Sequence, residues 1–169
     1  MAATPPGTVK FTDPPLRVVL VEPQIPPNTG NIARLCAATR CHLVLVGKLG
    51  FELSDAHLKR AGLDYWDYVS WEHLPDSEAF FASTAPTSLH LLTRHANHSY
   101  ADMPVARGDC LVFGKETTGL GPALLQRFPQ QCYTIPMAEP RVRSLNLSSA
   151  VAIVVYDALR RLDALPTPG

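Results

Sequence analysis

The sequence has few charged residues, no net charge and no long apolar run. Charged residues make up 18% of its 169 positions, apolar residues make up 46%, and the formal net charge is zero. Because a neutral protein has no overall field that attracts nucleic acid, such a role must rest on local clusters such as Arg141 with Arg143. No apolar stretch suffices for a membrane span, and residues 1–12 lack the apolar segment of a signal peptide. We therefore expect a protein without a membrane partner.

The sequence also lacks the spacing of a metal site. Its four cysteines, Cys36, Cys41, Cys110 and Cys132, form no C-x-x-C pair, and no histidine stands at zinc-finger spacing. Each cysteine lies among apolar residues, which indicates small core side chains with free thiols. We expect no bound metal and a reducing, cytoplasmic setting.

Common nucleotide-binding motifs are missing as well. No G-x-G-x-x-G follows the first apolar run, and there is no P-loop. What is present is an alternation of strand and helix patterns, without internal repeats. Strands are predicted at 16–21, 42–46, 66–69, 89–93, 110–113 and 132–135. Helices are predicted from Asn28 or Thr29 to about 40, at 54–61 and 71–82, after residue 120 to about 128, and up to about 162. This order predicts an α/β fold with a mostly parallel sheet.

The expected boundaries leave one domain. Residues 1–15 contain four prolines and little apolar content, which indicates a flexible amino-terminal tail. Residues 16–163 form the predicted domain, and residues 164–169 form a short carboxyl-terminal tail. No composition change suggests a second domain.

The segment 143–149 places short polar side chains before a helix without charge from Leu145 to Tyr156. A helix that is apolar on every side must be buried on every side. One domain of this size rarely supplies that much cover, so a partner subunit is expected. The polar loop, entered through Ile135-Pro136-Met137, would then lie beside both a pocket and an interface.

Three predicted loops, at 25–34, 113–120 and 135–148, are the candidate ligand site. In open α/β sheets, ligands bind at the carboxyl ends of strands. Gly114 allows close approach of a ligand or only a tight turn. Glu116 could fix a loop through backbone N–H groups or hold a ligand cation, and Ser144 could simply cap a helix. Arg34 could be an ordinary surface residue.

Several motifs resemble one family. Residues 22–37 (EPQIPPNTGNIARLCA) and 61–65 (AGLDY) strongly resemble the TrmL/YibK group of the SPOUT RNA methyltransferases. Phe113-Gly114, with residues 116–117 and 119–120, is similar to the second SPOUT motif. Residues 135–137 and 144–148, with Tyr156 downstream, are similar to the third. The resemblance extends over residues 16–163 in the same order.

The resemblance implies a SPOUT α/β fold whose carboxyl-terminal segment forms a trefoil knot. It implies S-adenosylmethionine as cofactor, a homodimer with the final helix in the interface, and tRNA as partner. The implied reaction is 2′-O-methylation of the wobble nucleotide, cytidine or modified uridine, of leucine tRNAs. Two alternatives are a related enzyme acting on another tRNA position or on ribosomal RNA, and a non-catalytic nucleotide- or RNA-binding module.

The resemblance also implies roles for individual residues. Arg34 would stabilise the reacting ribose oxygen, and Tyr156 would contact the second subunit or RNA. The implied catalytic residues are Arg34 and Asn146, the cofactor-binding residues are Leu92, Gly114, Ile135, Met137, Ser144 and Leu145, and the site-shaping or RNA-binding residues are Asn28, Asn31, Glu116, Arg141, Arg143 and Tyr156. Lys115 and Thr118 depart from the group, where proline and arginine are frequent, so RNA contacts of this loop are expected to differ.

Overall fold

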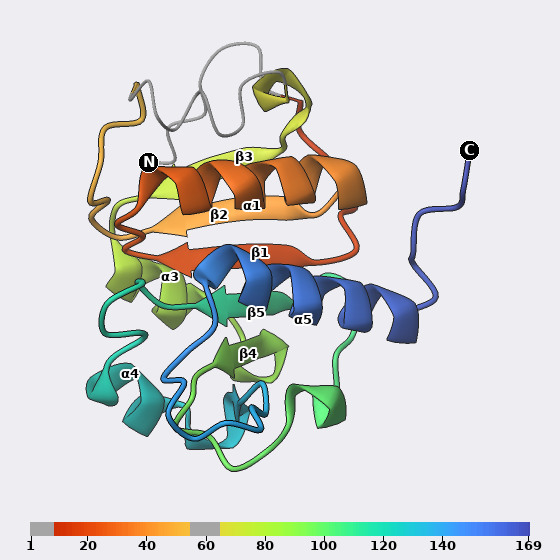
Figure 1. The fold of residues 1–169 in the computed structure, drawn as a ribbon. Coiled ribbons are helices and arrows are strands. Elements are labelled where there is room, and N and C mark those ends of the chain that lie inside the picture. Colours follow the sequence, from red (N-terminus) through yellow and green to blue (C-terminus); the bar gives the residue numbers. More distant parts are fainter. Residues whose placement is uncertain (1–8, 55–64) are drawn as a thin grey trace.

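The computed structural model describes residues 9–54 and 65–169. Its centre is a six-stranded sheet in the order β3-β2-β1-β5-β4-β6, in which every neighbouring pair is parallel (Figure 1). The strands are β1 (Arg17–Val21), β2 (His42–Val46), β3 (Trp71–Leu74), β4 (Leu89–Leu92), β5 (Cys110–Phe113) and β6 (Cys132–Tyr133). This confirms the prediction of an α/β fold with a parallel sheet.

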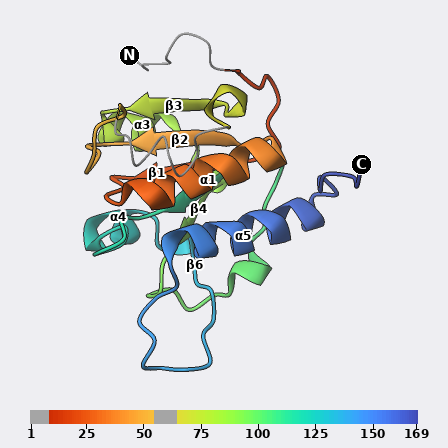
Figure 2. The same ribbon diagram turned by 45° about the horizontal axis from the view of Figure 1, so that its top comes forward.

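Helices cover both faces of the sheet. On one face α1 (Pro26–Thr39) and α5 (Leu147–Arg161) lie side by side, as both Figure 1 and Figure 2 show. On the other face α3 (Ser77–Ser83) and α4 (Pro122–Arg127) pack through Phe80, Phe81 and Leu124. Short 3₁₀ turns are η1 (Trp66–Tyr68), η2 (Pro86–Ser88), η3 (Tyr100–Asp102) and η4 (Pro129–Gln131).

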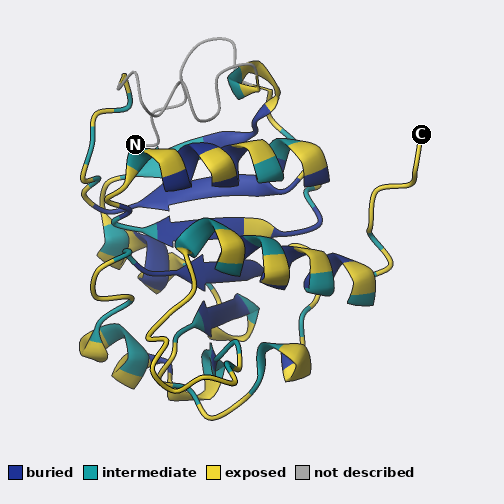
Figure 3. Ribbon diagram, viewed as in Figure 1, coloured by how far each residue is buried: buried dark blue, intermediate teal, exposed yellow. Residues whose placement is uncertain are grey.

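The central strands are buried on both faces, which explains their nearly continuous apolar sequences. All of β2 is buried, and in Figure 3 the strands of the sheet are its most buried part. Successive residues point to opposite sides, so Val18 and Leu20 pack towards α1 and α5, whereas Val19 packs towards α3. The register between β1 and β2 follows from this alternation, because a shift by one residue would reverse every side chain.

The cysteines are free thiols, as predicted. Cys36, Cys41 and Cys110 are buried, and Cys132 is half-buried. Burial raises the pKa of Cys41 to about 11 and that of Cys110 to about 11. These thiols therefore stay protonated at neutral pH and act as apolar core groups.

The predictions for residues 66–82 were wrong. Residues 66–68 form the 3₁₀ turn η1 instead of a strand, and the predicted helix at 71–82 is β3 followed by α3. Trp71 pairs with Leu43 in the sheet. Pro75 separates the two elements because it cannot continue a strand, and Asp76 accepts a 2.9 Å hydrogen bond from Ala79 N to cap α3. The helix predicted at 54–61 lies outside the described residues, apart from Ser54.

Two helix starts also differ from the predictions. Helix α1 begins at Pro26 and not at Asn28 or Thr29, and no side chain caps it. Prolines at its first two positions need no acceptor for an N–H group, so a polar cap is unnecessary. Helix α5 begins at Leu147, with Asn146 and not Ser144 as its N-cap. Asn28 is thereby left free for another role.

The strand order creates a switch point between β1 and β5. From β1 the chain continues to β2 on one side, whereas from β5 it continues towards β6 on the other side. At such a point the loops separate and leave a crevice outside the carboxyl ends of the strands. The loops after β1 and β5 therefore flank the expected ligand position.

Helix α5 is not fully covered within one chain. Val151, Val154 and Val155 are buried, but Ile153 and Tyr156 are 38% and 44% exposed. The expectation of burial on every side is thus unmet by the domain itself. An exposed apolar face such as that of Ile153 and Tyr156 is typical of a protein–protein interface.

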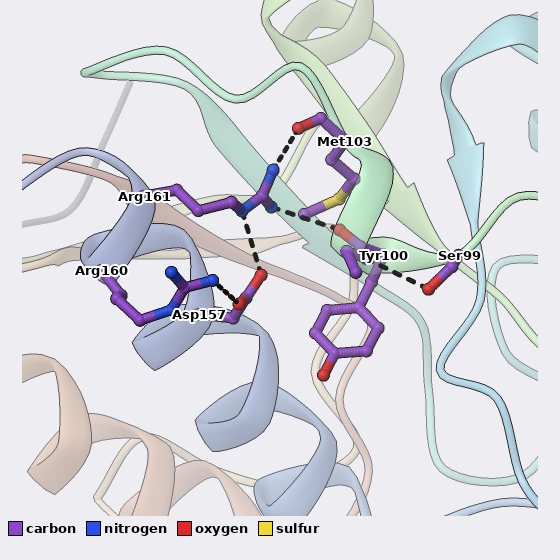
Figure 4. A network of polar contacts seen from close by, with 7 residues as sticks. Ser99, Tyr100, Met103, Asp157, Arg160 and Arg161 are labelled. Atoms are coloured by element: carbon purple, nitrogen blue, oxygen red, sulfur yellow. Dashed lines mark hydrogen bonds and ion pairs between the residues drawn. The ribbon is translucent and has the colours of Figure 1, made fainter.

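The carboxyl-terminal half of α5 is held by Arg161, as Figure 4 shows. Its Nε donates to Asp157 Oδ2 at 3.0 Å within the helix. Its other nitrogens donate to the carbonyl oxygens of Met103 and Tyr100, the latter at 3.2 Å. This network joins α5 to the η3 segment, which is also connected to the segment after β6 by the bridge between Ser99 and Thr134.

Candidate active site

The three predicted loops meet at the carboxyl edge of the sheet. Leu92 at the end of β4 is in register with Phe113 of β5 and with Tyr133 of β6. Leu92, Gly114 and Ile135 therefore stand at the ends of three neighbouring strands. The loop after β1 joins them from across the switch point between β1 and β5.

Glu116 fixes the loop that precedes α1. One carboxylate oxygen accepts from Gln24 N at 2.9 Å, and the other accepts from Ile25 N at 3.0 Å and from Asn28 Nδ2 at 3.4 Å. Of the two roles considered for this glutamate, the structure supports loop fixation. Charge-assisted bonds of this kind are about twice as strong as neutral ones, so the clamp is a firm one.

A second contact extends this clamp to the third loop. Asn146 Nδ2 donates to Asn28 Oδ1 at 3.1 Å, across 118 positions of sequence. A carboxylate can only accept, so Glu116 fixes the orientation of the Asn28 amide and directs its oxygen towards Asn146. Asn146 Oδ1 accepts in turn from Ser148 N at 2.9 Å, which caps α5. We call the chain Glu116–Asn28–Asn146 the amide relay.

Gly114 is required by the fold of its own loop. A Cβ atom at this position would overlap the backbone of Gly119 and Leu120. The loop closes on itself through Gly119 N, which donates to Lys115 O at 2.9 Å, with Gly119 at φ 68°. The glycine thus allows a tight turn, which was one of the two roles considered.

Lys115 joins the ends of β1 and β5. Its Nζ lies 3.0 Å from Glu22 Oε2. Glu22 has a φ of 51°, a left-handed conformation that is uncommon for a residue other than glycine. Strained backbone of this kind persists where neighbouring structure holds it, and functional sites are frequent places for it.

An open groove lies beside the third loop. It has a volume of about 730 Å³, which is within the range of small-molecule sites. Three predicted cofactor residues line it, whereas Leu92, Gly114 and Ser144 do not. The lining residues are Ser99, Tyr100, Ala101, Ile135, Pro136, Met137, Ala138, Glu139, Val142, Leu145 and Ile153.

Three arginines belong to the third loop or contact it. Arg141 Nε lies 2.7 Å from Glu139 Oε1, and hydrogen bonds from this arginine lower the pKa of Glu139. Arg94 Nη1 donates to Arg143 O at 3.5 Å and so connects the loop after β4 to the third loop. The side chains of Arg141 and Arg143 are exposed, which leaves them available to an anionic partner.

Arg34 lies apart from these loops. It is exposed on α1 together with Asn31, about 12 Å along the helix axis from Pro26. Within residues 9–54 and 65–169, neither a hydrogen bond nor an ion pair connects Arg34 to the amide relay. Its guanidinium carbon lies 4.8 Å from the centre of the Tyr65 ring. Among the described residues, the two predicted catalytic residues, Arg34 and Asn146, are therefore not joined by a hydrogen bond or an ion pair within one chain.

Two contacts of the site were not predicted from sequence. Gln24 takes part through its backbone and also accepts from Thr117 Oγ1 at 2.6 Å. Tyr65 belongs to a matching motif but received no role. Both residues belong to the matching motifs, 22–37 and 61–65, and this membership was the sequence signal available for them.

The fold is that of an α/β protein with a parallel sheet, and an open groove lies beside the loop that follows its edge strand β6. The chain belongs to the SpoU rRNA Methylase family, whose model matches residues 15–156. This agrees with the SPOUT resemblance of the motifs.

Individual relatives are similar over most of the chain. A tRNA (cytidine(34)-2′-O)-methyltransferase of Burkholderia pseudomallei (strain 1106a) is 49% identical over 147 residues, which are 85% of this chain and 94% of that protein. A solved structure described as giving insight into 2-OH methylation of C/U34 on tRNA has a TM-score of 0.79 and 40% identity, and the match covers 86% of this chain and 95% of that one. An AdoMet-bound rRNA methyltransferase from Sinorhizobium meliloti shares the fold with a TM-score of 0.78 at 24% identity, over 91% of this chain and 59% of that one.

None of the helices in the described part of the chain has the length and apolar character needed to cross a membrane. Nor do residues 9–54 and 65–169 bring together three or more side chains that could hold a metal ion.

Proposed function

We propose that the protein is an S-adenosylmethionine-dependent tRNA ribose 2′-O-methyltransferase that acts on the wobble nucleotide, position 34. The single observation that carries the proposal is the amide relay. It joins the three family motifs at the carboxyl edge of the sheet, and a groove of small-molecule size lies beside the third of these motifs. The names of the relatives supply the position of the nucleotide and the kind of base.

The residues present fit the cofactor. Ile135, Met137 and Leu145 provide apolar contact for an adenosine group, and the exposed backbone of the third loop provides directed polar atoms. Gly114 and Leu92 stand at the adjacent strand ends, and Ser144 lies in the same loop. When bound, S-adenosylmethionine supplies a methyl group made electrophilic by its sulfonium.

The protein contributes positioning and charge. The amide relay holds the loops in one geometry, so the ribose oxygen can be placed in line with the methyl group. Arg34 stabilises negative charge on that oxygen as its proton leaves. Since a guanidinium stays protonated, Arg34 is not the proton acceptor, and the proton passes to water, a substrate phosphate or a neighbouring polar group.

A homodimer completes the site in this proposal. Within one chain Arg34 stands away from the groove, whereas the exposed Ile153 and Tyr156 of α5 offer an apolar surface for a second copy. The segment between β6 and α5 projects from the body in Figure 2, which leaves it accessible to that copy. The proposal also includes a trefoil knot in the carboxyl-terminal segment, because the family resemblance implies one.

The RNA partner is bound through local charge. The protein has no net charge, so phosphate contacts must come from side chains such as Arg141 and Arg143, which a dimer would double. Local contacts of this kind suit a small target such as an anticodon stem-loop. Leucine tRNAs are the expected substrates, in the cytoplasm.

The test is methyl transfer from radiolabelled S-adenosylmethionine into bulk tRNA by the purified protein, with ribose methylation mapped afterwards. Label at the 2′-oxygen of nucleotide 34 supports the proposal. Label at another tRNA position or only in ribosomal RNA points to a related enzyme. Cofactor binding in a calorimeter without transfer to any RNA points to a binding module and contradicts the proposal.

A further inference from the structure

The guanidinium of Arg34 rests on an aromatic ring. Its Cζ lies 4.8 Å from the centre of the Tyr65 ring, within the range of a cation–π contact. Among the described residues Arg34 donates no hydrogen bond to a protein acceptor and pairs with no carboxylate. Within the described part of the chain, the Tyr65 ring is thus the contact found to restrict this exposed side chain.

The ring itself stands on a fixed support. Tyr65 precedes η1, where Tyr68 N donates to Tyr65 O at 2.8 Å and Val69 N donates to Trp66 O at 3.2 Å. Trp66 packs against the core and meets Trp71 edge-to-face, with ring centres 5.3 Å apart. Trp71 belongs to β3, so the position of Tyr65 is tied to the sheet.

We propose that Tyr65 is a positioning residue for Arg34; this rests on the proposed function. An exposed arginine has many rotamers, and ordering it for each turnover opposes catalysis through lost entropy. A ring face restricts those rotamers while leaving every N–H donor free, which a carboxylate partner would not do. In this proposal the guanidinium reaches the ribose oxygen already oriented, and no carboxylate of residues 9–54 and 65–169 competes for it.

A different role would place Tyr65 against the RNA. Tyr65 is 38% exposed and Tyr68 is 64% exposed, so either ring could stack on an unpaired base. Our proposal assigns Tyr65 to Arg34 instead, because the observed contact of its ring is with the guanidinium. The two roles differ in how Tyr65 affects RNA binding once Arg34 is removed.

The experiment compares Tyr65→Leu, Tyr65→Phe and Tyr68→Leu in the full-length protein with an anticodon stem-loop substrate. We expect Tyr65→Leu to lower kcat about threefold to tenfold, with KM for RNA within about twofold, because a cation–π contact has that size. Tyr65→Phe keeps the ring face and should retain wild-type kcat. Equal losses in Tyr65→Leu and Tyr68→Leu would overturn the proposal.

Two further measurements separate the outcomes. RNA affinity should be the same for Arg34→Ala and for Arg34→Ala combined with Tyr65→Leu; a further loss in the double variant would show direct stacking and reject the positioning role. The NMR signal of the Arg34 Nε–H group should carry a ring-current shift in the wild type and Tyr65→Phe that Tyr65→Leu removes. Its absence in an active wild type overturns this inference alone, whereas a wild type that methylates no RNA overturns the proposed function as well.

Discussion

At the scale of single residues, Asn146 carries two separate tasks. Its Oδ1 caps α5 through Ser148 N, and its Nδ2 donates to Asn28. Loss of a cap costs about 1 kcal/mol, and loss of a hydrogen bond between side chains costs about the same. The two tasks can be separated, since serine retains the capping oxygen but has no amide donor of that length.

We predict that Asn146→Ala lowers the free energy of unfolding by about 2 kcal/mol and abolishes methyl transfer. Asn146→Ser should recover about half of the stability and little of the activity. Urea unfolding and a methylation assay on the same preparations measure both effects. Full activity in Asn146→Ser would show that the amide relay is dispensable.

Arg34 gives the second prediction. Arg34→Ala should reduce methyl transfer about a hundredfold or more, because removing a group that stabilises developing charge has an effect of this size. Cofactor affinity, measured by calorimetry, should stay near that of the wild type, since Arg34 lies outside the groove. Arg127→Ala, which removes an exposed arginine paired with Glu78 on the other face of the sheet, is the matched control. Near-normal turnover of Arg34→Ala would refute its role.

His42 gives a prediction on pH. Its Nδ1 lies 2.7 Å from Ser70 Oγ and its Nε2 lies 3.1 Å from Glu72, yet burial outweighs these partners and lowers the pKa of His42. The unfolded chain then binds this proton at a higher pH than the folded chain. The contribution of neutral His42 to the free energy of unfolding is fully present above the ordinary histidine pKa of about 6.5. It is lost as the pH falls through the lower pKa of the folded state.

We expect denaturant midpoints to drop between about pH 6.5 and more acidic values, with a smaller slope in His42→Gln. A slope that is unchanged in His42→Gln would assign the acid sensitivity to other groups.

At the scale of elements, the loop after β5 depends on close backbone approach. Gly114→Ala should destabilise the protein by about 2 kcal/mol or more, because the added carbon meets rigid backbone of residues 119 and 120. Gly119→Ala meets no atom and should cost only about 1 kcal/mol for its left-handed conformation. Thermal unfolding of the two variants compares these effects, and equal losses would contradict the steric account.

The sequence patterns predicted some elements well and others badly. Strands β2 and β5 have the predicted bounds because they are buried on both faces and read as short apolar runs. Residues 71–82 were misassigned because Trp71 and the following polar residues show no clear period, and pairing with β2 decides their conformation. The residue pattern of one segment contains no information on a partner strand that lies far away in the sequence.

The candidate site was predicted only at the level of loops. Strand ends with glycine and polar residues identified the three segments. The contact between Asn28 and Asn146 could not be predicted, since it joins side chains 118 positions apart. Glu116 as loop clamp was one of two alternatives, and only the geometry decides between them. The contact of Arg34 with Tyr65 depends on how η1 packs against α1, which no periodicity indicates.

At the scale of the whole molecule, the exposed face of α5 predicts the state of assembly. Ile153→Asp should convert a dimer into a monomer at micromolar concentration and abolish methyl transfer, because a charge would be buried in an apolar interface. Leu165→Asp is the control, since Leu165 is similarly exposed at 43% but lies beyond the helix. Light scattering gives the mass of each variant. A fully active wild-type monomer would contradict the shared site.

The amide relay has a consequence for synthesis of the protein. Its members enter the chain in the order Asn28, Glu116, Asn146, and the helix with the exposed apolar face follows directly after the last of them. Chains grow from the amino terminus, so this contact closes late. A product that terminates before position 146 lacks both the closing asparagine and the surface for pairing. Aborted translation is therefore expected to yield inactive fragments, and not a partly active enzyme that would methylate RNA without selectivity.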